Sequence, residues 1–305
     1  MKIVVSGSTG VIGSLLVNAF NGRGHEVIRL IRPSTSVASP ERKVRWDPEQ
    51  GTIDRAGLEG ADAVVHLAGE NVFGRWSETK KRRIRDSRVH GTRLLSETLA
   101  TLARRPATLL SASAIGYYGD GGDGVLTEQS GPGNDFLAHV AREWEGATGP
   151  AAQVGVRVLQ MRFGVVLTMT GGAMGKMLPP FRLGLGGPIG TGMQFVSWIE
   201  RSDLVTAILH LLTQTDLSGP VNLTSPTPVT NREFAATLGR VLGRPAVVTV
   251  PAFALRMAFG TDAAAMLQSG QRVLPERLVA SGFRFEFETI EPALRHLLAP
   301  SESGR

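Results

Sequence analysis

Apolar residues in the first three quarters of the chain occur in short unbroken runs, and most runs are followed by a stretch with helical spacing. The runs typical of buried strands are KIVVSG (2–7), EVIRLI (26–31), KVRW (43–46), ADAVVHLAG (61–69), TLLSAS (108–113), VGVRVLQMRF (154–163) and PVNLT (220–224). The helical stretches are 13–23, 77–103, 134–147 and 203–212. This alternation predicts a parallel sheet covered on both faces. Right-handed crossovers then give a doubly wound α/β fold.

Two regions break this rhythm. Residues 171–192 are rich in glycine and proline, and we expect a functional loop or disorder there. After about residue 226 the pattern predicts short helices and a β-like FRFEFE at 283–288. We therefore expect two domains. Residues 1–225 form the sheet domain, with 170–200 as a substrate-side loop, and 226–305 form a smaller C-terminal α+β lobe.

Composition excludes several function classes. The chain has no cysteine, so disulfides and thiolate nucleophiles are absent, and its six histidines are too scattered to predict a metal site. Net charge is +6, but the basic run KKRRIRDSR (80–88) lacks interleaved aromatics and fits a solvated helix face. We expect no nucleic-acid partner. No apolar run approaches a membrane span, and MKIVVSG is typical of a first strand rather than a signal peptide. A cytoplasmic protein without a membrane partner is the expectation.

The segment SGSTGVIG (6–13) lies between the first strand and the first helix, and it has the spacing G-x-x-G-x-x-G. Gly7 permits the tight turn, Gly10 lets a pyrophosphate approach backbone N–H groups, and Gly13 lets the helix pack on the strand. Directly after an N-terminal strand, this pattern predicts a dinucleotide site of the Rossmann type. The predicted cofactor-binding residues of the loop are Gly7, Ser8, Thr9, Gly10, Val11, Ile12 and Gly13.

The end of the second strand distinguishes NADP from NAD. An acidic residue there would bind the ribose 2′-OH and favour NAD, but the strand ends in Ile31-Arg32-Pro33. The Arg32 guanidinium can pair with a 2′-phosphate. We predict NADP as the cofactor, ahead of NAD.

With these features the chain resembles the extended short-chain dehydrogenase/reductase superfamily, and in particular its epimerase-like 39U branch of NAD-dependent epimerase/dehydratase family proteins. The resemblance spans almost the whole chain. The matching segments include SGSTGVIG (6–13), VVHLAGEN (64–71), RW (75–76), SRVHGTRLL (87–95), SASAIGYYGD (111–120), DFLAHVAREWE (135–145), RFGVVL (162–167), MLPPFRLGLGGPIGTG (177–192), SWIERSDLV (197–205) and SGQRVLPERL (269–278).

The resemblance implies positions for cofactor and substrate. Leu67, Ala68 and Gly69 would pass under the adenosine side of NADP(H), and Arg88 would reach the cofactor. The 171–192 loop, which carries Lys176, and Trp198 would line a cleft for a small-molecule substrate. Many superfamily members dimerise through helices such as 77–104 and 134–147, so by analogy we expect a homodimer.

The catalytic pair usual in the superfamily is missing. That pair is a Tyr-x-x-x-Lys on a helix, in which the ammonium lowers the phenol pKa from its ordinary value of about 10. Here Phe136 and Leu137 stand near the tyrosine position, and Val140 and Ala141 stand near the lysine position.

The candidate catalytic residues are therefore Ser113, Tyr117 and Tyr118. Ser113 stands where the superfamily serine is expected, and the only two tyrosines of the chain follow it. Either a tyrosine donates a proton in a reduction, or both rings pack the loop and bind substrate. Glu200 replaces the branch's usual histidine, and Asp203 is expected to cap the next helix.

Two functions remain open from the sequence. One is an NADP(H)-dependent oxidoreductase or epimerase-like enzyme acting on a small carbonyl or alcohol substrate. The other is a catalytically weak NADPH-binding sensor or interaction protein, which the missing Tyr-Lys pair favours.

Overall fold

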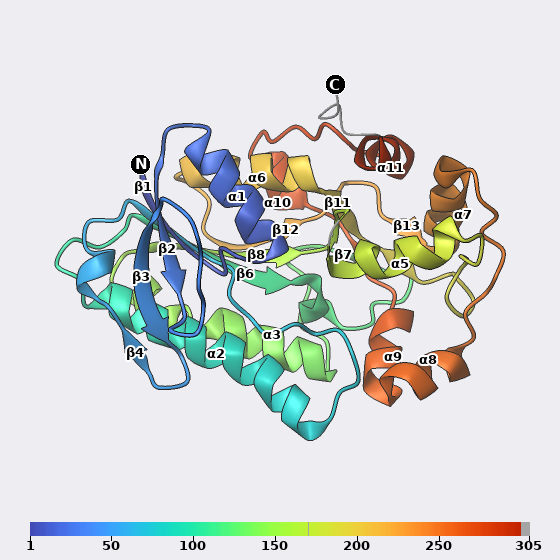
Figure 1. The fold of residues 1–305 in the computed structure, drawn as a ribbon, viewed down its shortest axis with the longest axis horizontal. Coiled ribbons are helices and arrows are strands. Elements are labelled where there is room, and N and C mark those ends of the chain that lie inside the picture. The colour runs from blue at the N-terminus through green and yellow to red at the C-terminus, as the bar shows by residue number, and fades with distance from the viewer. Residues whose placement is uncertain (170, 300–305) are drawn as a thin grey trace.

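The structure, a computed structural model, describes residues 1–169 and 171–299 and is built on one eight-stranded sheet (Figure 1). Its strand order is β12-β8-β6-β5-β1-β2-β3-β4, and every neighbouring pair is parallel except β3 and β4. The bounds are β1 (Lys2–Ser6), β2 (Glu26–Ile31), β3 (Arg42–Asp47), β4 (Thr52–Ile53), β5 (Ala63–His66), β6 (Thr108–Ala114), β8 (Arg157–Phe163) and β12 (Gly219–Leu223). The predicted doubly wound parallel sheet is confirmed.

Helices cover both faces of this sheet. On one face lie α1 (Val11–Asn21), α6 (Arg201–Thr213) and the short α10 (Glu276–Ala280), and on the other lie α2 (Glu78–Ala100), α3 (Phe136–Gly146) and α4 (Gly149–Gln153). In β1, Ile3 and Val5 pack under α1 and α6, whereas Val4 packs on the α2 side. This alternation explains why the strand is apolar throughout.

A smaller C-terminal lobe lies beside the carboxyl ends of β6, β8 and β12. Its strands are β7 (Val125–Leu126), β9 (Val165–Leu167), β10 (Phe195–Val196), β11 (Trp198–Glu200), β13 (Val229–Thr230) and β14 (Arg272–Val273). Its helices are α5 (Gly172–Arg182), α7 (Asn231–Leu242), α8 (Ala252–Phe259), α9 (Thr261–Gln268) and α11 (Ile290–Leu298). The sheet domain also contains two short 3₁₀ turns, η1 (Ala56–Leu58) and η2 (Ile115–Tyr118).

The buried centre of this lobe, which we call the lobe core, draws on residues from both sides of position 225. Leu167, Met174 and Trp198 from β9, α5 and β11 pack with Phe234 of α7 and Leu294 of α11. The lobe is therefore discontinuous in the chain, and elements within 165–200 belong to it as much as to the sheet.

The glycine- and proline-rich stretch at 171–192, which we expected to be a loop or disordered, contains a helix instead. Residues Gly172–Arg182 form α5, with Pro179 and Pro180 in its last turn. Met174, Leu178 and Phe181 recur at helical spacing and enter the lobe core. Burial of this apolar face explains why a helix forms here. The helix was not predicted because glycine and proline disfavour helices.

Helix α6 begins at Arg201, earlier than expected, and its N-cap is Glu200, whose carboxylate accepts the backbone N–H of Ser202. The expectation that Asp203 caps this helix is wrong. Its two carboxylate oxygens accept the backbone N–H groups of Glu286 and Phe287, at 2.8 and 2.9 Å.

Those contacts also correct the β-like expectation for 283–288, which runs as irregular chain. Its alternating phenylalanines divide between two sites, because Phe283 and Phe285 pack against the sheet core whereas Phe287 enters the lobe core. The phenylalanines thus recur at every second position because this segment contacts two hydrophobic cores, and not because it forms a strand.

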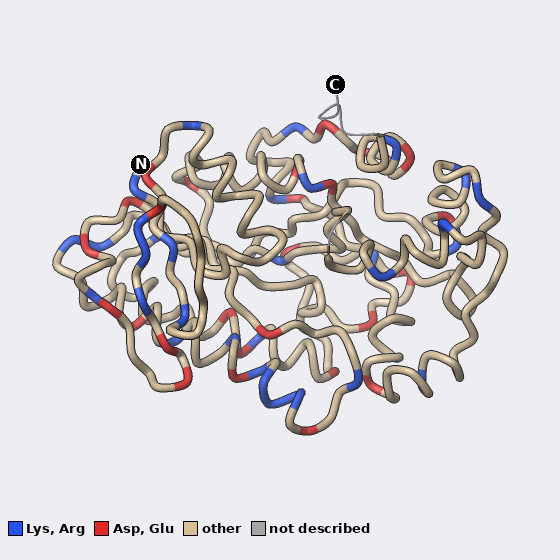
Figure 2. The backbone as a smooth tube through the Cα atoms, in the orientation of Figure 1, with Lys and Arg blue, Asp and Glu red and all other residues tan. Residues whose placement is uncertain are grey.

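The basic run at 80–88 lies on α2 among acidic residues, and Figure 2 shows positive and negative positions side by side there. Lys80 and Arg83 pair with Glu70, and Arg85 pairs with Glu143. These ion pairs neutralise positive charges that would remain unpaired on a nucleic-acid-binding surface. None of the helices in 1–169 and 171–299 is long and apolar enough to cross a bilayer.

Candidate functional site

The glycine turn between β1 and α1 is shaped by contacts that only glycine allows. Gly7 has a φ of +64°, and a Cβ there would lie 2.8 Å from the Leu67 carbonyl carbon and 2.9 Å from the Ala68 nitrogen. A Cβ on Gly13 would collide with the Gly7 carbonyl oxygen. The turn therefore lies in close contact with the residues that follow β5, and α1 packs directly on the turn.

This turn leaves polar groups available to an anion. The N-cap of α1 is Gly10, no side chain caps the helix, and its first turn contains no acidic residue. The Ser8 hydroxyl is buried, at 2% residue exposure, and has no hydrogen-bond partner within 1–169 and 171–299. Thr9 and Gly10 are exposed and Val11 and Ile12 half-buried. An uncapped helix N-terminus beside an unpaired buried hydroxyl suits a pyrophosphate.

Arg29 braces the turn from β2, a role that the sequence analysis missed. Its Nη1 donates to the Ser8 carbonyl oxygen at 3.1 Å, and its Nε donates to Glu41 at 3.2 Å. A single arginine inside the otherwise apolar EVIRLI run was the available signal. Arg32, at the end of the same strand, is exposed and has no side-chain partner among residues 1–169 and 171–299.

The end of β5 is held by a buried polar chain, also missed from the sequence. The Ser6 hydroxyl accepts the Leu67 backbone N–H at 3.1 Å and lies 2.6 Å from His66 Nδ1. On its other side, His66 Nε2 lies 3.0 Å from the Thr92 hydroxyl, to which the Trp144 indole donates at 2.9 Å. The chain ties the predicted adenosine segment to α2 and α3.

Arg88 lies beside the exposed Gly69 but is held by other groups. Its Nη1 donates to the carbonyl oxygens of Glu70 and Ile84, at 2.9 and 3.0 Å, and its guanidinium stacks 5.0 Å from the Trp144 ring. Burial lowers the pKa of Arg88 to about 10, so the group remains cationic at neutral pH. It contributes a positive charge next to the predicted adenosine segment.

The three candidate catalytic residues meet in one buried cluster at the carboxyl ends of β6, β8 and β12. Strand register places Ser113, Arg162 and Asn222 side by side on these three strands. The Ser113 hydroxyl donates to Glu145 of α3 at 2.7 Å. Arg162 donates twice to the same carboxylate, each at 2.8 Å, and once to the Tyr118 hydroxyl at 2.9 Å.

The two tyrosines differ in this cluster. Tyr118 is buried, donates to Asn222 at 2.7 Å, and has a pKa raised by burial to about 12. Tyr117 is half-buried, and its ring lies 3.5 Å from the Arg162 guanidinium. Its hydroxyl has no hydrogen-bond partner in the described part of the chain. Of the two phenols, Tyr117 is the one free to meet a ligand.

Phe136, one of the two residues expected near the position of the superfamily tyrosine, takes part in aromatic packing. Phe136, at the start of α3, meets the Trp76 ring edge-on at 5.5 Å and lies 5.7 Å below the Lys81 ammonium. Lys176 is exposed on α5. Trp198 is fully buried in the lobe core and donates to the Thr227 carbonyl oxygen at 3.0 Å, so its indole serves packing in this structure.

Comparison with known proteins places this arrangement in a family. The family model described as the NAD dependent epimerase/dehydratase family matches residues 3–223, and one described as a domain of unknown function (DUF1731) matches residues 250–297. Epimerase family protein Mb2239 of Mycobacterium bovis is 43% identical over 293 residues, covering 96% of each chain. Human epimerase family protein SDR39U1 is 38% identical over 303 residues, covering 98% of this chain and 100% of the human one.

A solved structure agrees along the whole fold. The crystal structure of human SDR39U1, isoform 2, with NADPH superposes with a TM-score of 0.89 at 36% identity, covering 97% of this chain and 99% of that one. From the match over residues 3–223 and from these relatives, we conclude that the chain belongs to the NAD dependent epimerase/dehydratase family and lies close to the SDR39U1 proteins.

Proposed function

We propose that this protein binds NADP(H) at the glycine turn and acts as a reductase or epimerase-like oxidoreductase on a small carbonyl or alcohol substrate. The observation that carries the proposal is the N-terminus of α1 beside the buried Ser8 hydroxyl, neither of which has a side-chain hydrogen-bond partner in the described part of the chain. A protein without a ligand there would leave a buried polar group unsatisfied, at a cost of about 1–3 kcal/mol. The human relative's crystal structure with NADPH supports the choice of cofactor.

Residues around the turn fit the parts of this dinucleotide. The N–H groups of α1 and the hydroxyls of Ser8 and Thr9 would bind the pyrophosphate. Leu67–Gly69, held by Ser6, would support the adenosine side. The exposed Arg32 would bind the 2′-phosphate. When bound, the nicotinamide supplies or accepts a hydride.

The residues that remain for proton transfer favour Tyr117. The Ser113 hydroxyl donates a hydrogen bond to Glu145. The Tyr118 hydroxyl donates to Asn222 and accepts from Arg162, and its pKa is about 12. The Tyr117 hydroxyl has no hydrogen-bond partner among residues 1–169 and 171–299, and its ring lies against the Arg162 guanidinium. We assign Tyr117 as the proton donor to a substrate carbonyl.

The second candidate function is NADPH binding without turnover, as in a sensor. The missing Tyr-x-x-x-Lys pair favours this alternative, because Phe136 and Leu137, which stand near the tyrosine position, transfer no proton. Consumption of NADPH with aldehyde or ketone substrates separates the two functions. In the enzyme, Tyr117→Phe lowers kcat by about 100-fold or more with unchanged NADPH affinity, as loss of a general acid requires. If no aldehyde or ketone in a broad panel caused NADPH oxidation, the sensor function would be the one supported.

Cofactor choice is tested by titrating the protein with NADPH and NADH, followed by quenching of tryptophan fluorescence. We expect Arg32→Ala to weaken NADPH about tenfold or more and leave NADH unchanged, because only NADPH carries the 2′-phosphate. Arg82→Ala, an exposed arginine on α2, is the matched control. Equal affinity for both cofactors that Arg32→Ala leaves unaltered would refute the NADP assignment.

A further inference from the structure

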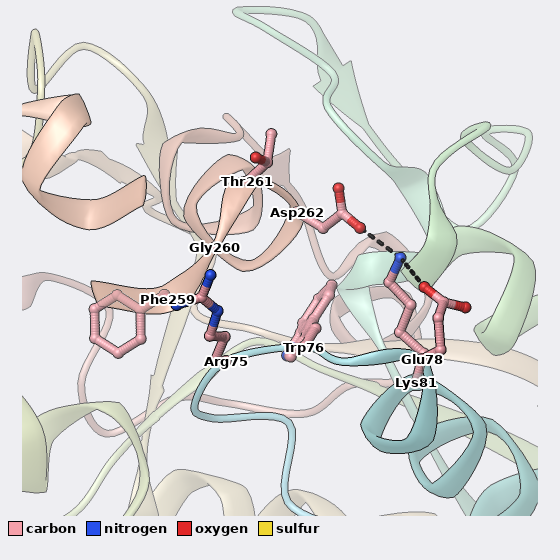
Figure 3. A pocket seen from close by; sticks show the side chains of 8 residues that line it. All are labelled: Arg75, Trp76, Glu78, Lys81, Phe259, Gly260, Thr261 and Asp262. Carbon is pink, nitrogen blue, oxygen red and sulfur yellow. Dashed lines mark hydrogen bonds and ion pairs between the residues drawn. The ribbon is translucent and has the colours of Figure 1, made fainter. Parts of the chain in front are cut away.

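A pocket of about 320 Å³ lies between the start of α2 and the turn that joins α8 to α9 (Figure 3). Its walls come from residues nearly two hundred positions apart, Arg75–Lys81 on the sheet domain and Phe259–Asp262 on the C-terminal lobe. The pocket is thus a space between the lobes. The RW motif at 75–76, which the resemblance singled out and the cofactor site does not use, forms its floor.

The charges of this pocket leave one cation free. Lys81 bonds Asp262 at 2.6 Å and Glu78 at 3.2 Å, and Figure 3 shows both links. These bonds raise the pKa of Lys81, with the Asp262 bond as the larger cause. Arg75 lines the same space, and it forms no hydrogen bond or ion pair through its side chain among residues 1–169 and 171–299. A guanidinium without a counter-ion is the group available to a ligand.

Arg75 lies close to Gly260 on the opposite side of the pocket. Gly260 has a φ of +83°, and a Cβ built on it would lie 3.6 Å from Arg75 Cγ and 3.9 Å from its Nε. The Arg75 side chain therefore lies at ordinary van der Waals distance from the α8–α9 turn. In the view of Figure 3 it lies between the rings of Phe259 and Trp76.

Trp76 connects this pocket to the chemistry of the cofactor site. Its indole N–H donates to the Val72 carbonyl oxygen at 2.7 Å, which fixes the ring. The same ring packs edge-on against Phe136, one of the two residues near the superfamily's tyrosine position. A molecule bound on Trp76 would lie next to the place where the family carries out its proton transfer.

We propose that this pocket binds the carboxylate of a small monocarboxylic substrate through Arg75, with its body against the Trp76 ring. The inference rests on the proposed function, for which it supplies a substrate class. A guanidinium meets a carboxylate in two parallel hydrogen bonds. The Trp76 ring offers one flat apolar face to the body of such a ligand. The volume is at the small end of known ligand pockets.

The remaining charges favour a monoanion over a phosphate or a cation. Glu78 and Asp262 lie at the rim and would repel a second negative charge more strongly than a first. Both are already bonded to Lys81, so neither is free for a cationic ligand. One unpaired guanidinium matches one unit of negative charge.

The test compares two acids with their neutral amides, benzoate with benzamide and phenylacetate with phenylacetamide, by saturation-transfer NMR with and without saturating NADPH. We expect at least one acid to bind about tenfold or more tightly than its amide, because a charge-assisted bidentate pair is lost in the amide. Arg75→Gln should bring that acid to the level of its amide and leave the amide unchanged. Arg82→Gln should change nothing.

A second variant, Trp76→Leu, should weaken the acid and its amide by the same factor, because it removes an apolar wall and no charge. Thermal unfolding by circular dichroism checks that each variant folds. Failure of both acids to bind the wild type, equal binding of each acid and its amide, or unchanged acid binding in Arg75→Gln would each overturn the inference. NADPH binding without carboxylate binding refutes this inference alone. Carboxylate binding lost in Arg75→Gln, without any NADPH binding, refutes the proposed function alone.

Discussion

His66 is a titratable side chain with no exposed surface, and its ring is enclosed by Ser6, Thr92 and the edge of Trp46, whose ring centre is 5.7 Å away. Burial lowers its pKa from 6.5 to about 4. The imidazole is therefore neutral at pH 7. One ring nitrogen donates and the other accepts, which is what the two flanking hydroxyls require.

The buried imidazole makes stability depend on pH. In the unfolded chain His66 takes up a proton near pH 6.5, whereas in the folded chain it does so only near pH 4. Protons therefore favour the unfolded state between these values. The free energy of unfolding should fall by about 3 kcal/mol as pH drops from 6.5 to 4, and stay level below that on account of this group. Urea unfolding across this range measures it.

The control for that experiment is the exposed His139. His66→Gln should flatten the pH profile between 6.5 and 4, and His139→Gln should not alter it. Parallel profiles for wild type and His66→Gln would show that His66 is not the group responsible.

Gly13 is a second residue whose effect follows from geometry alone. A methyl group there collides with the Gly7 carbonyl oxygen, so Gly13→Ala must move α1 or the turn. We expect a loss of about 1–3 kcal/mol in stability and a fall in NADPH affinity of about tenfold or more, because displaced N–H groups no longer meet the pyrophosphate. Gly146→Ala, in a helix with nothing within 4 Å, is the matched control and should leave binding intact.

Among the elements, β6, β8 and α3 meet at one buried ion pair, and β12 is connected to it through the hydrogen bond from Tyr118 to Asn222. Arg162 and Glu145 have side-chain exposures of 3% and 13%, and Ser113 and Tyr118 complete their hydrogen bonds. The pair thus holds the Tyr117–Tyr118 turn on the sheet. In this position it decides where the proposed proton donor stands.

Removal of one partner leaves the other charged and buried. We expect Arg162→Met or Glu145→Leu alone to cost about 3–5 kcal/mol, and the double variant to recover part of that loss. Denaturant unfolding of the four proteins gives the coupling. Single substitutions that each cost under about 1 kcal/mol would contradict a buried, mutually dependent pair.

For the whole molecule, the two lobes share hydrophobic packing. Helix α5 and strands β9 and β11 precede residue 225, yet their apolar faces pack on α7 and α11. A chain that ends at residue 225 would expose Met174, Phe181 and Trp198 to water. Exposed faces of that size lead to aggregation rather than to an independent domain.

We therefore expect a fragment of residues 1–225 to aggregate or to lack a cooperative thermal transition, whereas the full chain unfolds in one transition. Gel filtration and near-ultraviolet circular dichroism compare the two. A soluble fragment with a sharp transition of its own would show that the sheet domain does not need the C-terminal lobe.

The sequence by itself determined the sheet, the glycine turn and the family. Apolar strand runs and the requirement for glycine at 7 and 13 follow from local sterics and from burial on both faces, and these are visible in one stretch of chain at a time. The absence of a Tyr-x-x-x-Lys pair was equally plain, because it is a matter of residue identity.

Only the tertiary structure decided which side chains meet. Strand register places Ser113 beside Arg162, and α3 then presents Glu145 to both. Packing against the lobe core stabilises a helix in a glycine-rich stretch. The backbone N–H groups of 286 and 287 bond to Asp203 and do not pair with another strand. Each outcome depends on contacts between residues far apart in the chain. The energies of such contacts cannot be predicted from a local sequence pattern. For the same reason, the pocket between Arg75 and Gly260 appears only once the two lobes are side by side.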